Sequence, residues 1–428
     1  MKQCSIIVFG DIGRSPRMVN HALAIADNTE YRINLYGYMD NKPTQALLSN
    51  PNIRIVDLNL WIVNLLKKMP RFLFLLYAIL RIAIQSLYLF LLLLFSRKQE
   101  FILVQNPPSI PVLHVVSLIK GIRRSKIIID FHNYGHTILA LQMRNKFILK
   151  MARSYEHQFS RSYDYALCVS QAMQKDLQQN WRINATVVYD KANINFNVIN
   201  KPKEKHELFM KLDFHWQWEV LNSNETLFTE ELNNQQVIEK VNRPGLIVSS
   251  TSWTKDEDFN ILVQALQKYE DLANIEQGRE YRKLYVVITG KGPMKEEFKE
   301  IFQKCNICWN HVKVNLAWLD IDDYPKLLGC ADLGICLHYS SSGLDLPMKV
   351  VDMFGAAHLY LLNHLMLQHQ KNGIVFDTPD DLFDHLSQAF RYESNILQKL
   401  KKGVEIFRTE TFDQEWRNKV LPFIRNLK

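Results

Sequence analysis

Short apolar runs alternate with longer stretches of helical periodicity along most of the chain. In the first half, CSIIVFG (4–10) and RINLYGY (32–38) are followed by KIIIDFHN (126–133). The second half resumes with GLIVSST (245–251) and LYVVITGKGP (284–293). Nearly continuous apolar strands separated by helices are typical of parallel sheets covered on both faces, so the pattern predicts two doubly wound α/β domains in tandem. Further strands are expected at 53–58, 101–105, 165–170, 186–190, 312–319 and 331–338, and helices at 15–27, 137–160 and 257–270.

The rhythm breaks once, in a polar stretch near the middle of the chain. A length of 428 residues with 47% hydrophobic residues allows two or three domains. We expect an N-terminal domain at 1–195, a linker or insertion at 196–243 and a C-terminal domain at 244–410. A final helix at 411–428 is expected to pack back on the N-terminal domain. Because ligands of such sheets bind outside the carboxyl ends of the strands, the cleft between the domains is the expected site.

The most apolar segment of the chain, at 72–95, could cross a bilayer by length alone, since a helix of this size spans roughly 36 Å. Arg81 near its middle would be costly in lipid. Strand-like runs flank the segment, and two strands of one sheet cannot lie on opposite sides of a membrane. Within 59–96 we therefore expect a bent or paired helix on a membrane face. A buried domain helix and a true span are the alternatives.

The net charge of +8 favours anionic partners, and no run of five like charges indicates a nucleic-acid tail. The first strand ends in GDIGRSPR, where Gly10 and Gly13 allow a tight turn before a helix N-terminus. Arg14 and Arg17 would add cationic donors suited to a diphosphate. The alternative is an ordinary loop with solvated arginines.

The run IIIDFHNYGH places Asp130, His132 and His136 at the end of a strand. Histidine is the natural proton acceptor near neutral pH, so His132 is a candidate to contact a sugar or accept a proton. A purely structural histidine is the alternative. Glu156, on the next helix, is expected to be a solvated carboxylate.

In the second half, the turn TGKGP presents Lys291 next to Gly290, and a small-residue loop at 340–343 precedes a helix that starts near Pro347. Loop amides and a helix start can cradle a phosphate. Lys349 would add positive charge, and Asp352 can accept two hydrogen bonds from a ribose diol. The alternative is a helix with incidental charges. The acids of LDIDDY (319–324) are expected to polarise a helix N-terminus rather than to bind a metal.

Seven motifs, in order along the chain, resemble the chitobiosyldiphosphodolichol beta-mannosyltransferase family: GDIGRSPRM, QNPPSIP, IDFHNYGH, SSTSWTKDEDF, ITGKGP, YPKLLGCADLGICLH and SSSGLDLPMKVVDMFG. The resemblance implies a two-domain GT-B glycosyltransferase that needs no metal or other cofactor. It implies GDP-mannose as donor, a GlcNAc2-diphosphodolichol acceptor, and inversion to a β1,4 linkage. The implied location is the cytosolic face of the endoplasmic reticulum membrane, with other lipid-linked-oligosaccharide mannosyltransferases as possible partners and no nucleic acid.

By the same resemblance, the C-terminal domain holds GDP and the N-terminal domain holds the lipid-linked acceptor. The loop at 11–17 would face the acceptor diphosphate or the reaction centre, and either Asp11 or His132 would be the base that takes the acceptor proton. The ribose would meet Asp352, and guanine the backbone near Trp318 and Leu319. The diphosphate would be surrounded by Ser252, Gly290, Lys291, Ser341, Ser342, Gly343, Leu344 and Lys349.

Two features depart from the family pattern. The family usually has a membrane anchor ahead of the first strand, so either the segment at 72–95 takes its place or the sequence begins late. The stretch 356–370 lacks the usual Gly-Leu-Pro turn, which predicts reduced or lost activity. A non-catalytic scaffold relative and an enzyme that uses a UDP-sugar are therefore the alternative functions.

Overall fold

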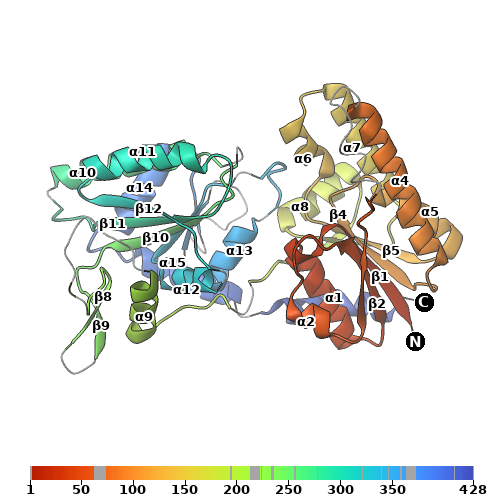
Figure 1. Cartoon of the computed structure of the whole chain (residues 1–428), viewed down its shortest axis with the longest axis horizontal. Helices are drawn as coiled ribbons and strands as arrows, with labels where there is room; N and C mark the ends of the chain where they lie inside the picture. Colours follow the sequence, from red (N-terminus) through yellow and green to blue (C-terminus); the bar gives the residue numbers. More distant parts are fainter. Residues whose placement is uncertain are drawn as a thin grey trace. The chain divides into compact units, whose positions relative to one another are not determined.

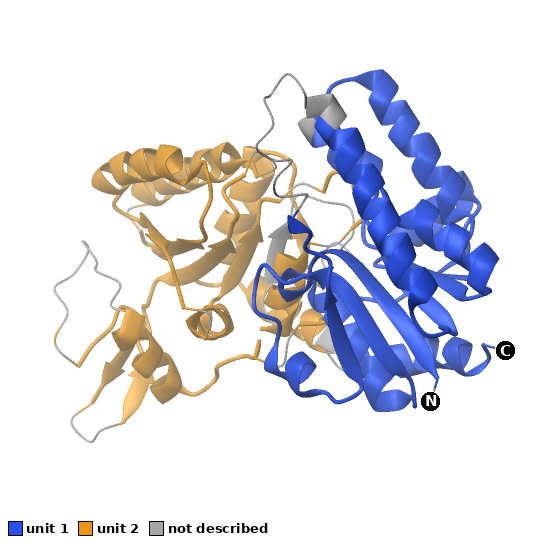
Figure 2. Cartoon of the chain, turned by 45° about the vertical axis from the view of Figure 1, so that its right-hand side comes forward, with its two compact units in different colours: residues 1–190, 411–428 blue, residues 191–410 orange. Residues whose placement is uncertain are grey.

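In a computed structural model, the chain divides into two compact units, Met1–Asp190 with Thr411–Lys428, and Lys191–Glu410 (Figure 2). The structure describes residues 2–61, 74–192, 195–212, 222, 224–232, 236–254, 257–276, 278–320, 322–338, 340–345, 347–356, 359–362, 373–408 and 410–427.

Unit 1 is built on a seven-stranded parallel sheet in the order β3-β2-β1-β4-β5-β6-β7 (Figure 1). The strand order reverses between β1 and β4, which makes this the switch point where a doubly wound sheet binds ligands. The predicted strands are confirmed: β1 (Gln3–Asp11), β2 (Arg32–Tyr38), β3 (Ile53–Asp57), β4 (Phe101–Asn106), β5 (Lys126–Phe131), β6 (Tyr165–Cys168) and β7 (Ala185–Val187).

The last residues of the chain belong to unit 1. The helices α16 (Phe412–Lys419) and α17 (Leu421–Arg425) share a hydrophobic core with α1 (Pro16–Asn28) and the sheet. The indole nitrogen of Trp416 donates to Nδ1 of His21 at 3.0 Å, and both side chains are fully buried. Closure of this core therefore joins residues almost 400 positions apart in sequence.

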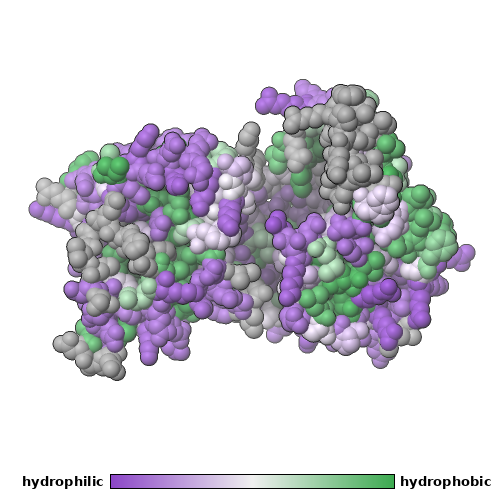
Figure 3. All heavy atoms as spheres, in the orientation of Figure 1, coloured by the Kyte–Doolittle hydropathy of each residue, from purple (hydrophilic) through white to green (hydrophobic). Residues whose placement is uncertain are grey.

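The apolar segment forms a single helix, α4 (Phe74–Phe95), beside α5 (Val112–Arg123). Residues 72–73 of the predicted segment, and 62–71 before it, lie outside the described residues. Leu89 and Leu93 are fully buried, whereas Leu87 and Phe95 are 59% and 80% exposed. By length and composition, Tyr77–Phe95 could cross a membrane, yet only 17% of that window is buried in the protein. Hydrophobic residues gather at the surface of unit 1 over α4 and α5 (Figure 3).

The prediction of one long helix over 137–160 is wrong, because two helices occupy this region. They are α6 (Gly135–Gln142) and α7 (Lys146–Ser160). Asn145 starts the second one, since its side chain accepts hydrogen bonds from the amides of Phe147 and Ile148 at 3.0 and 3.3 Å. Unit 1 also contains α2 (Gln45–Ser49), α8 (Gln171–Asp176), a 3-10 helix, η1 (Ile12–Arg14), and a short π-helix, η3 (Leu177–Trp181).

Unit 2 repeats the doubly wound arrangement with a six-stranded parallel sheet in the order β12-β11-β10-β13-β14-β15. Here the order reverses between β10 and β13. The strands are β10 (Gly245–Ser250), β11 (Leu284–Thr289), β12 (Val312–Ala317), β13 (Leu333–Cys336), β14 (Leu359–Leu362) and β15 (Ile374–Val375), and the helices are α10 (Phe259–Ile275), α11 (Lys295–Cys308), α12 (Asp323–Cys330), α13 (Met348–Gly355), α14 (Pro379–Ala389) and α15 (Ile396–Arg408).

The polar stretch expected as a linker or insertion folds as part of unit 2. It contains α9 (Pro202–Leu212) and the hairpin β8 (Thr229–Glu231) and β9 (Val237–Glu239). Leu208, Phe209, Leu227 and Phe228 are buried in one cluster with β10, β11 and α13. Because these apolar side chains complete the cover over one face of the sheet, the stretch is a packed insertion rather than a free spacer.

Candidate functional site

The loops at the carboxyl ends of β10 and β11 press against each other. Gly290 has φ +151°, and a Cβ there would lie 1.8 Å from the carbonyl oxygen of Thr251. A Cβ on Gly292 would lie equally close to the carbonyl oxygen of Ser252. Only glycine fits such an approach, so the TGKGP turn holds the backbone of Ser252 against the segment that carries Lys291.

Glu257, which sequence reasoning missed, joins this loop to α13. Glu257 is only 3% exposed. One oxygen of its carboxylate accepts hydrogen bonds from the Thr251 hydroxyl and from the Ser252 amide, the latter at 3.0 Å. The other oxygen pairs with Nζ of Lys349. The Lys349 side chain is 22% exposed, so it is fixed at the surface by a buried partner. Its position therefore depends on a residue 92 places away in sequence.

Lys291 and Trp318 meet at the ends of neighbouring strands. Nζ of Lys291 lies 3.9 Å from the centre of the Trp318 ring, within range of a cation–π contact. Trp318 is 57% exposed, an unusual exposure for so large an aromatic side chain. The pair offers a cation and an aromatic face at one edge of the sheet.

The serine loop before α13 is closed on itself in this structure. Asp345 accepts hydrogen bonds from the hydroxyls of Ser340 and Ser342, the latter at 3.2 Å. The amides of Gly343 and Leu344 donate to those two hydroxyls at 3.0 and 3.2 Å. Gly343 has φ +71°, a conformation that favours glycine. Ser341 also lies in this half-buried loop. Of the predicted phosphate-binding hydroxyls, that of Ser342 is therefore held by Asp345, and it would have to rearrange to bind an anion.

Asp352 lies half-buried on α13, close to Tyr324. Burial raises the pKa of its carboxyl to about 7. The pKa of Tyr324 is raised mainly by burial and also by the nearby charge of Asp352. The Tyr324 and Ser250 hydroxyls are buried and lie next to each other, and among the described residues neither has a hydrogen-bond partner beyond the other. Buried polar groups normally find partners, so this cluster has the donors and acceptors to bind a ligand hydroxyl or diol.

Of the acids in LDIDDY (319–324), Asp323 has a structural role. Asp323, in the first turn of α12, is buried and accepts two hydrogen bonds from Nζ of Lys211 at 2.6 and 2.7 Å. Asp322 precedes the helix but makes no side-chain cap. The carboxylate at the start of α12 is thus neutralised by an ion pair with Lys211. Over the part of the chain that the structure describes, no group of three or more histidine, cysteine or acidic residues could hold a metal ion.

In unit 1, the loop after β1 is organised by Asp11. Its carboxylate accepts hydrogen bonds from the amides of Gly13 and Asn41 at 3.1 and 3.2 Å and from the Asn41 side chain. Burial acts to raise the pKa of Asp11, but the Asn41 and Gly13 hydrogen bonds and the charge of Arg14 bring it below its ordinary value. A Cβ on Gly13 would lie 2.8 Å from the carbonyl oxygen of Asn41, so glycine is required there. Gly10 has open space around it.

Arg17 is the clearest correction to the predicted site. It is 3% exposed and makes a two-point contact with Asp130 at 2.7 and 2.8 Å, and it also donates to Asp190 at 3.0 Å. The guanidinium is therefore committed to internal carboxylates and does not offer a diphosphate donor. Arg14, whose side chain is 77% exposed, is the cation of this loop that solvent and ligands can reach.

His132 is the surface end of the same network. Its Nε2 lies 2.8 Å from Asp130, and its side chain is 22% exposed. Nε2 of His21 lies 3.2 Å from the same carboxylate of Asp130, also within hydrogen-bond distance. Burial acts to raise the pKa of Asp130, but Arg17 and then His132 hold it well below its usual range. An ionised acceptor on Nε2 directs the proton of the ring to that nitrogen, which leaves Nδ1 of His132 as the basic atom.

A second histidine–carboxylate pair lies near the first. Glu156, expected as a solvated carboxylate, is fully buried and accepts hydrogen bonds from His136 Nδ1 at 2.7 Å, from Asn106 at 2.9 Å and from the Gly135 amide at 2.8 Å. Burial acts to raise the pKa of Glu156, but the hydrogen bonds of His136 and Asn106 lower it overall. Glu156 therefore fixes the loop that follows β5. Next to it is an apolar pocket of about 250 Å³ lined by Ser109, His136, Ile138, Leu139 and Ala152 among others.

Comparison with known proteins gives close relatives over nearly the whole chain. The chain is 38% identical to the chitobiosyldiphosphodolichol beta-mannosyltransferase of Mus musculus, a match that covers 98% of this chain and 88% of the mouse protein. Identity with the human protein of the same name is also 38%, over 98% and 91% of the two chains. A protein of Arabidopsis thaliana named UDP-glycosyltransferase TURAN is 37% identical over 98% and 96%. No protein-family model matches the chain.

Solved structures share the fold at low sequence identity. A glycosyltransferase from Rickettsia africae superimposes with a TM-score of 0.62 at 13% identity, covering all of this chain and 98% of its own. The lipopolysaccharide outer core galactosyltransferase WaaB has a TM-score of 0.59 at 11% identity, over 98% and 99%. These neighbours confirm the expected fold class, a GT-B arrangement of two doubly wound domains.

Proposed function

Because the chain belongs to the chitobiosyldiphosphodolichol beta-mannosyltransferase family, we propose that it transfers mannose from GDP-mannose to GlcNAc2-diphosphodolichol. The motif resemblance is confirmed by these relatives. In the proposed reaction, O4 of the terminal acceptor sugar attacks C1 of the mannose, and a β1,4 bond forms. The bond from C1 to the diphosphate breaks, GDP leaves with the electron pair, and a base of the protein takes the acceptor proton. One such displacement inverts the α-linked donor.

Unit 2 is the proposed donor domain, and the observation that carries this is the gathering of Lys291, Lys349 and Asp352 at the carboxyl ends of its strands. A ribose diol fits the acceptor Asp352, beside the Ser250 and Tyr324 hydroxyls, which have no partner beyond each other among the described residues. The exposed Trp318 supplies an aromatic face next to Lys291. Two lysines and loop amides can balance the charge of the leaving diphosphate, so we expect transfer to continue when divalent ions are chelated.

Unit 1 is the proposed acceptor domain and the source of the base. Both Asp11 and His132 remain candidates, and the geometry favours His132. Asp130 orients the His132 ring and would stabilise its protonated form after it takes the proton. Asp11 is ionised but both of its oxygens accept hydrogen bonds from Asn41 or Gly13, and its low pKa makes it the weaker base.

The helix α4 supports a location at a membrane surface. Its exposed side chains are large and apolar, and Arg97 and Lys98 follow its end. Since β3 and β4 on either side of it belong to one sheet, we propose that α4 lies on the membrane rather than crossing it. The cytosolic face of the endoplasmic reticulum is the proposed location, where other lipid-linked-oligosaccharide mannosyltransferases could be partners.

The test is transfer of labelled mannose by the purified full-length chain to a diphosphate-linked chitobiose lipid. We expect product from GDP-mannose, with or without a chelator, and sensitivity of the product to a β-mannosidase. Transfer only from a UDP-sugar would support the second candidate function, which the name of the Arabidopsis relative favours. GDP binding without transfer would support the scaffold alternative, which rests on the stretch 356–370, most of it outside the described residues.

A further inference from the structure

A large cavity in unit 1 lies on a sheet face that is polar where a doubly wound sheet is usually apolar. Alternate residues of a strand share a face, and in β2 these are Arg32, Asn34 and Tyr36. The register of β2 and β3 sets Asn34 beside Arg54. The opposite face of these strands carries Leu35 and other apolar residues of the unit 1 core. A face built in this way is suited to a polar ligand rather than to a packed helix.

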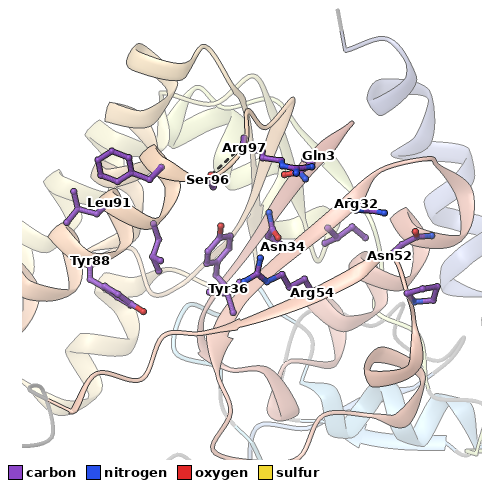
Figure 4. A pocket seen from close by; sticks show the side chains of 15 residues that line it. Gln3, Arg32, Asn34, Tyr36, Asn52, Arg54, Tyr88, Leu91, Ser96 and Arg97 are labelled. Carbon is purple, nitrogen blue, oxygen red and sulfur yellow. Dashed lines mark hydrogen bonds between the residues drawn. The ribbon is translucent and has the colours of Figure 1, made fainter. Parts of the chain in front are cut away.

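Three arginines give this cavity a strong positive charge. Arg32 and Arg54 come from the sheet, and Arg97 comes from the connection between α4 and β4. The lining contains no aspartate or glutamate, and within the described residues no carboxylate forms an ion pair with any of the three. Figure 4 shows Tyr36 and Arg54 on the sheet between Tyr88 of α4 on one side and Arg32 on the other. Arginines unbalanced by acids favour an anionic, phosphate-bearing ligand.

The wall that α4 contributes is mainly apolar. Leu91, Leu92 and Phe95 line the cavity, and Leu91 and Phe95 are also 39% and 80% exposed to solvent. The cavity has a volume of about 940 Å³, which is large for a phosphate ion alone. Its apolar wall is continuous with the exposed apolar side of α4. A ligand that satisfies the whole cavity therefore has an anionic head and a hydrocarbon tail.

The cavity is distinct from the proposed reaction centre. Gln3 lines it at the amino end of β1, whereas Asp11 lies at the carboxyl end. A strand rises about 3.3 Å per residue, so these positions are roughly 25 Å apart. The diphosphate of an acceptor whose terminal sugar reaches Asp11 or His132 would not lie here.

We propose that this cavity binds an anionic glycerophospholipid of the membrane, with the phosphate at Arg32, Arg54 and Arg97 and an acyl chain along Leu91, Leu92 and Phe95. The lipid would fix unit 1 on the bilayer through a specific contact in addition to the general apolar contact of α4. This site goes beyond the transferase reaction and does not depend on it.

Vesicle binding by the full-length chain tests the proposal. The parent is compared with a triple variant, Arg32→Gln, Arg54→Gln and Arg97→Gln, on phosphatidylcholine vesicles with and without phosphatidylinositol. A matched control removes three exposed lysines of unit 2 (Lys203→Gln, Lys304→Gln, Lys402→Gln). We expect the cavity variant to bind the anionic vesicles at least about tenfold more weakly, and the control to change by less than about threefold. Equal loss in both variants would overturn the specific site.

Two further measurements separate the lipid from other occupants. Phosphatidylinositol with a photoreactive group on its acyl chain should crosslink within residues 88–97, and crosslinks confined to other segments would overturn the proposal. Glycerol 3-phosphate and inorganic phosphate should compete poorly. Competition as strong as that of the lipid would make this a soluble-phosphate site instead.

Transfer to a water-soluble acceptor should be unchanged in the triple variant, so failure of the lipid proposal and failure of the proposed reaction can be told apart. If the triple variant does not fold, as judged by thermal unfolding, Arg54→Gln alone must lower binding to anionic vesicles by about threefold or more. A folded Arg54→Gln protein with parental binding would overturn the proposal.

Discussion

The two units share one fold but treat polar groups at the carboxyl ends of their strands in opposite ways. In unit 1, Arg17, Asp130 and His21 satisfy one another inside the protein. In unit 2, Asp352 is half-buried and has no ion-pair partner among the described residues, and the neighbouring Tyr324 and Ser250 hydroxyls have no partner there beyond each other. Internal pairing stabilises a scaffold, whereas unsatisfied groups cost stability until a ligand binds. The same position in one fold thus serves for structure in one unit and, we infer, for donor binding in the other.

The largest expected effect comes from breaking the internal pairing. Arg17→Met leaves Asp130 buried without its main partner, so we expect the free energy of unfolding to fall by about 3–5 kcal/mol in urea titrations. Arg14→Met, on the exposed arginine of the same loop, is the control and should change stability by less than about 0.5 kcal/mol. Similar small values for both variants would show that the Arg17 network does not hold the unit together.

His132, at the surface end of that network, should affect the rate of mannose transfer. His132→Ala is expected to lower kcat for mannose transfer by about 10²–10⁴-fold, because a proton acceptor is lost, while the Kd for GDP stays unchanged. Asp11→Asn, which keeps an acceptor oxygen for Asn41, should lower kcat by less than about tenfold. The reverse ranking would assign the base to Asp11.

Replacing Asp352, unlike replacing Arg17, should increase the free energy of unfolding. Its folded-state pKa of about 7 lies above the ordinary carboxyl value of 3.8, so the folded state binds the extra proton and stability falls as the pH rises from about 4 to 7. Asp352→Asn removes this slope. At pH 8 we expect the unliganded variant to be roughly 2–4 kcal/mol more stable than the parent, with little difference at pH 4. A parent whose stability is flat over this range would contradict the assignment.

The same variant separates stability from binding. Loss of the carboxylate that would accept the ribose diol should weaken GDP about tenfold in calorimetry, although the protein becomes more stable. A gain in stability with unchanged GDP affinity would leave Asp352 outside the nucleotide site.

The smallest effect is expected at Lys349, since it already has a protein partner. Lys349→Met should weaken GDP binding by only about 3–5-fold, because Glu257 already balances part of the Lys349 charge. The double variant Lys349→Met with Glu257→Gln controls for the carboxylate left unpaired: it should restore stability but not GDP affinity. Restoration of both would make Lys349 a structural residue only.

Apolar periodicity was sufficient to predict β1 to β7 and β10 to β13, because parallel strands buried on both faces are apolar throughout. The short strands β8, β9, β14 and β15 were not predicted. Gly290 was also predictable as a turn, since few residues other than glycine reach its backbone conformation. Arg17 was misassigned because its partners are 113 and 173 residues away. Local sequence cannot tell a guanidinium that meets a phosphate from one that meets a distant carboxylate. Glu257 was missed for the same reason, and Asn145 showed that one capping side chain can divide an otherwise continuous helical pattern.

The return of residues 411–428 to unit 1 has a consequence for synthesis on the ribosome. Trp416 and its neighbours close the core around His21, yet they leave the exit tunnel after all of Lys191–Glu410. At a translation rate of about 5–20 residues per second, α16 and α17 are synthesised roughly 10–45 s after the first 190 residues. A nascent chain in this state exposes the apolar side of α1, which makes it a natural client for chaperones, and a fragment that ends at Asp190 should be poorly soluble.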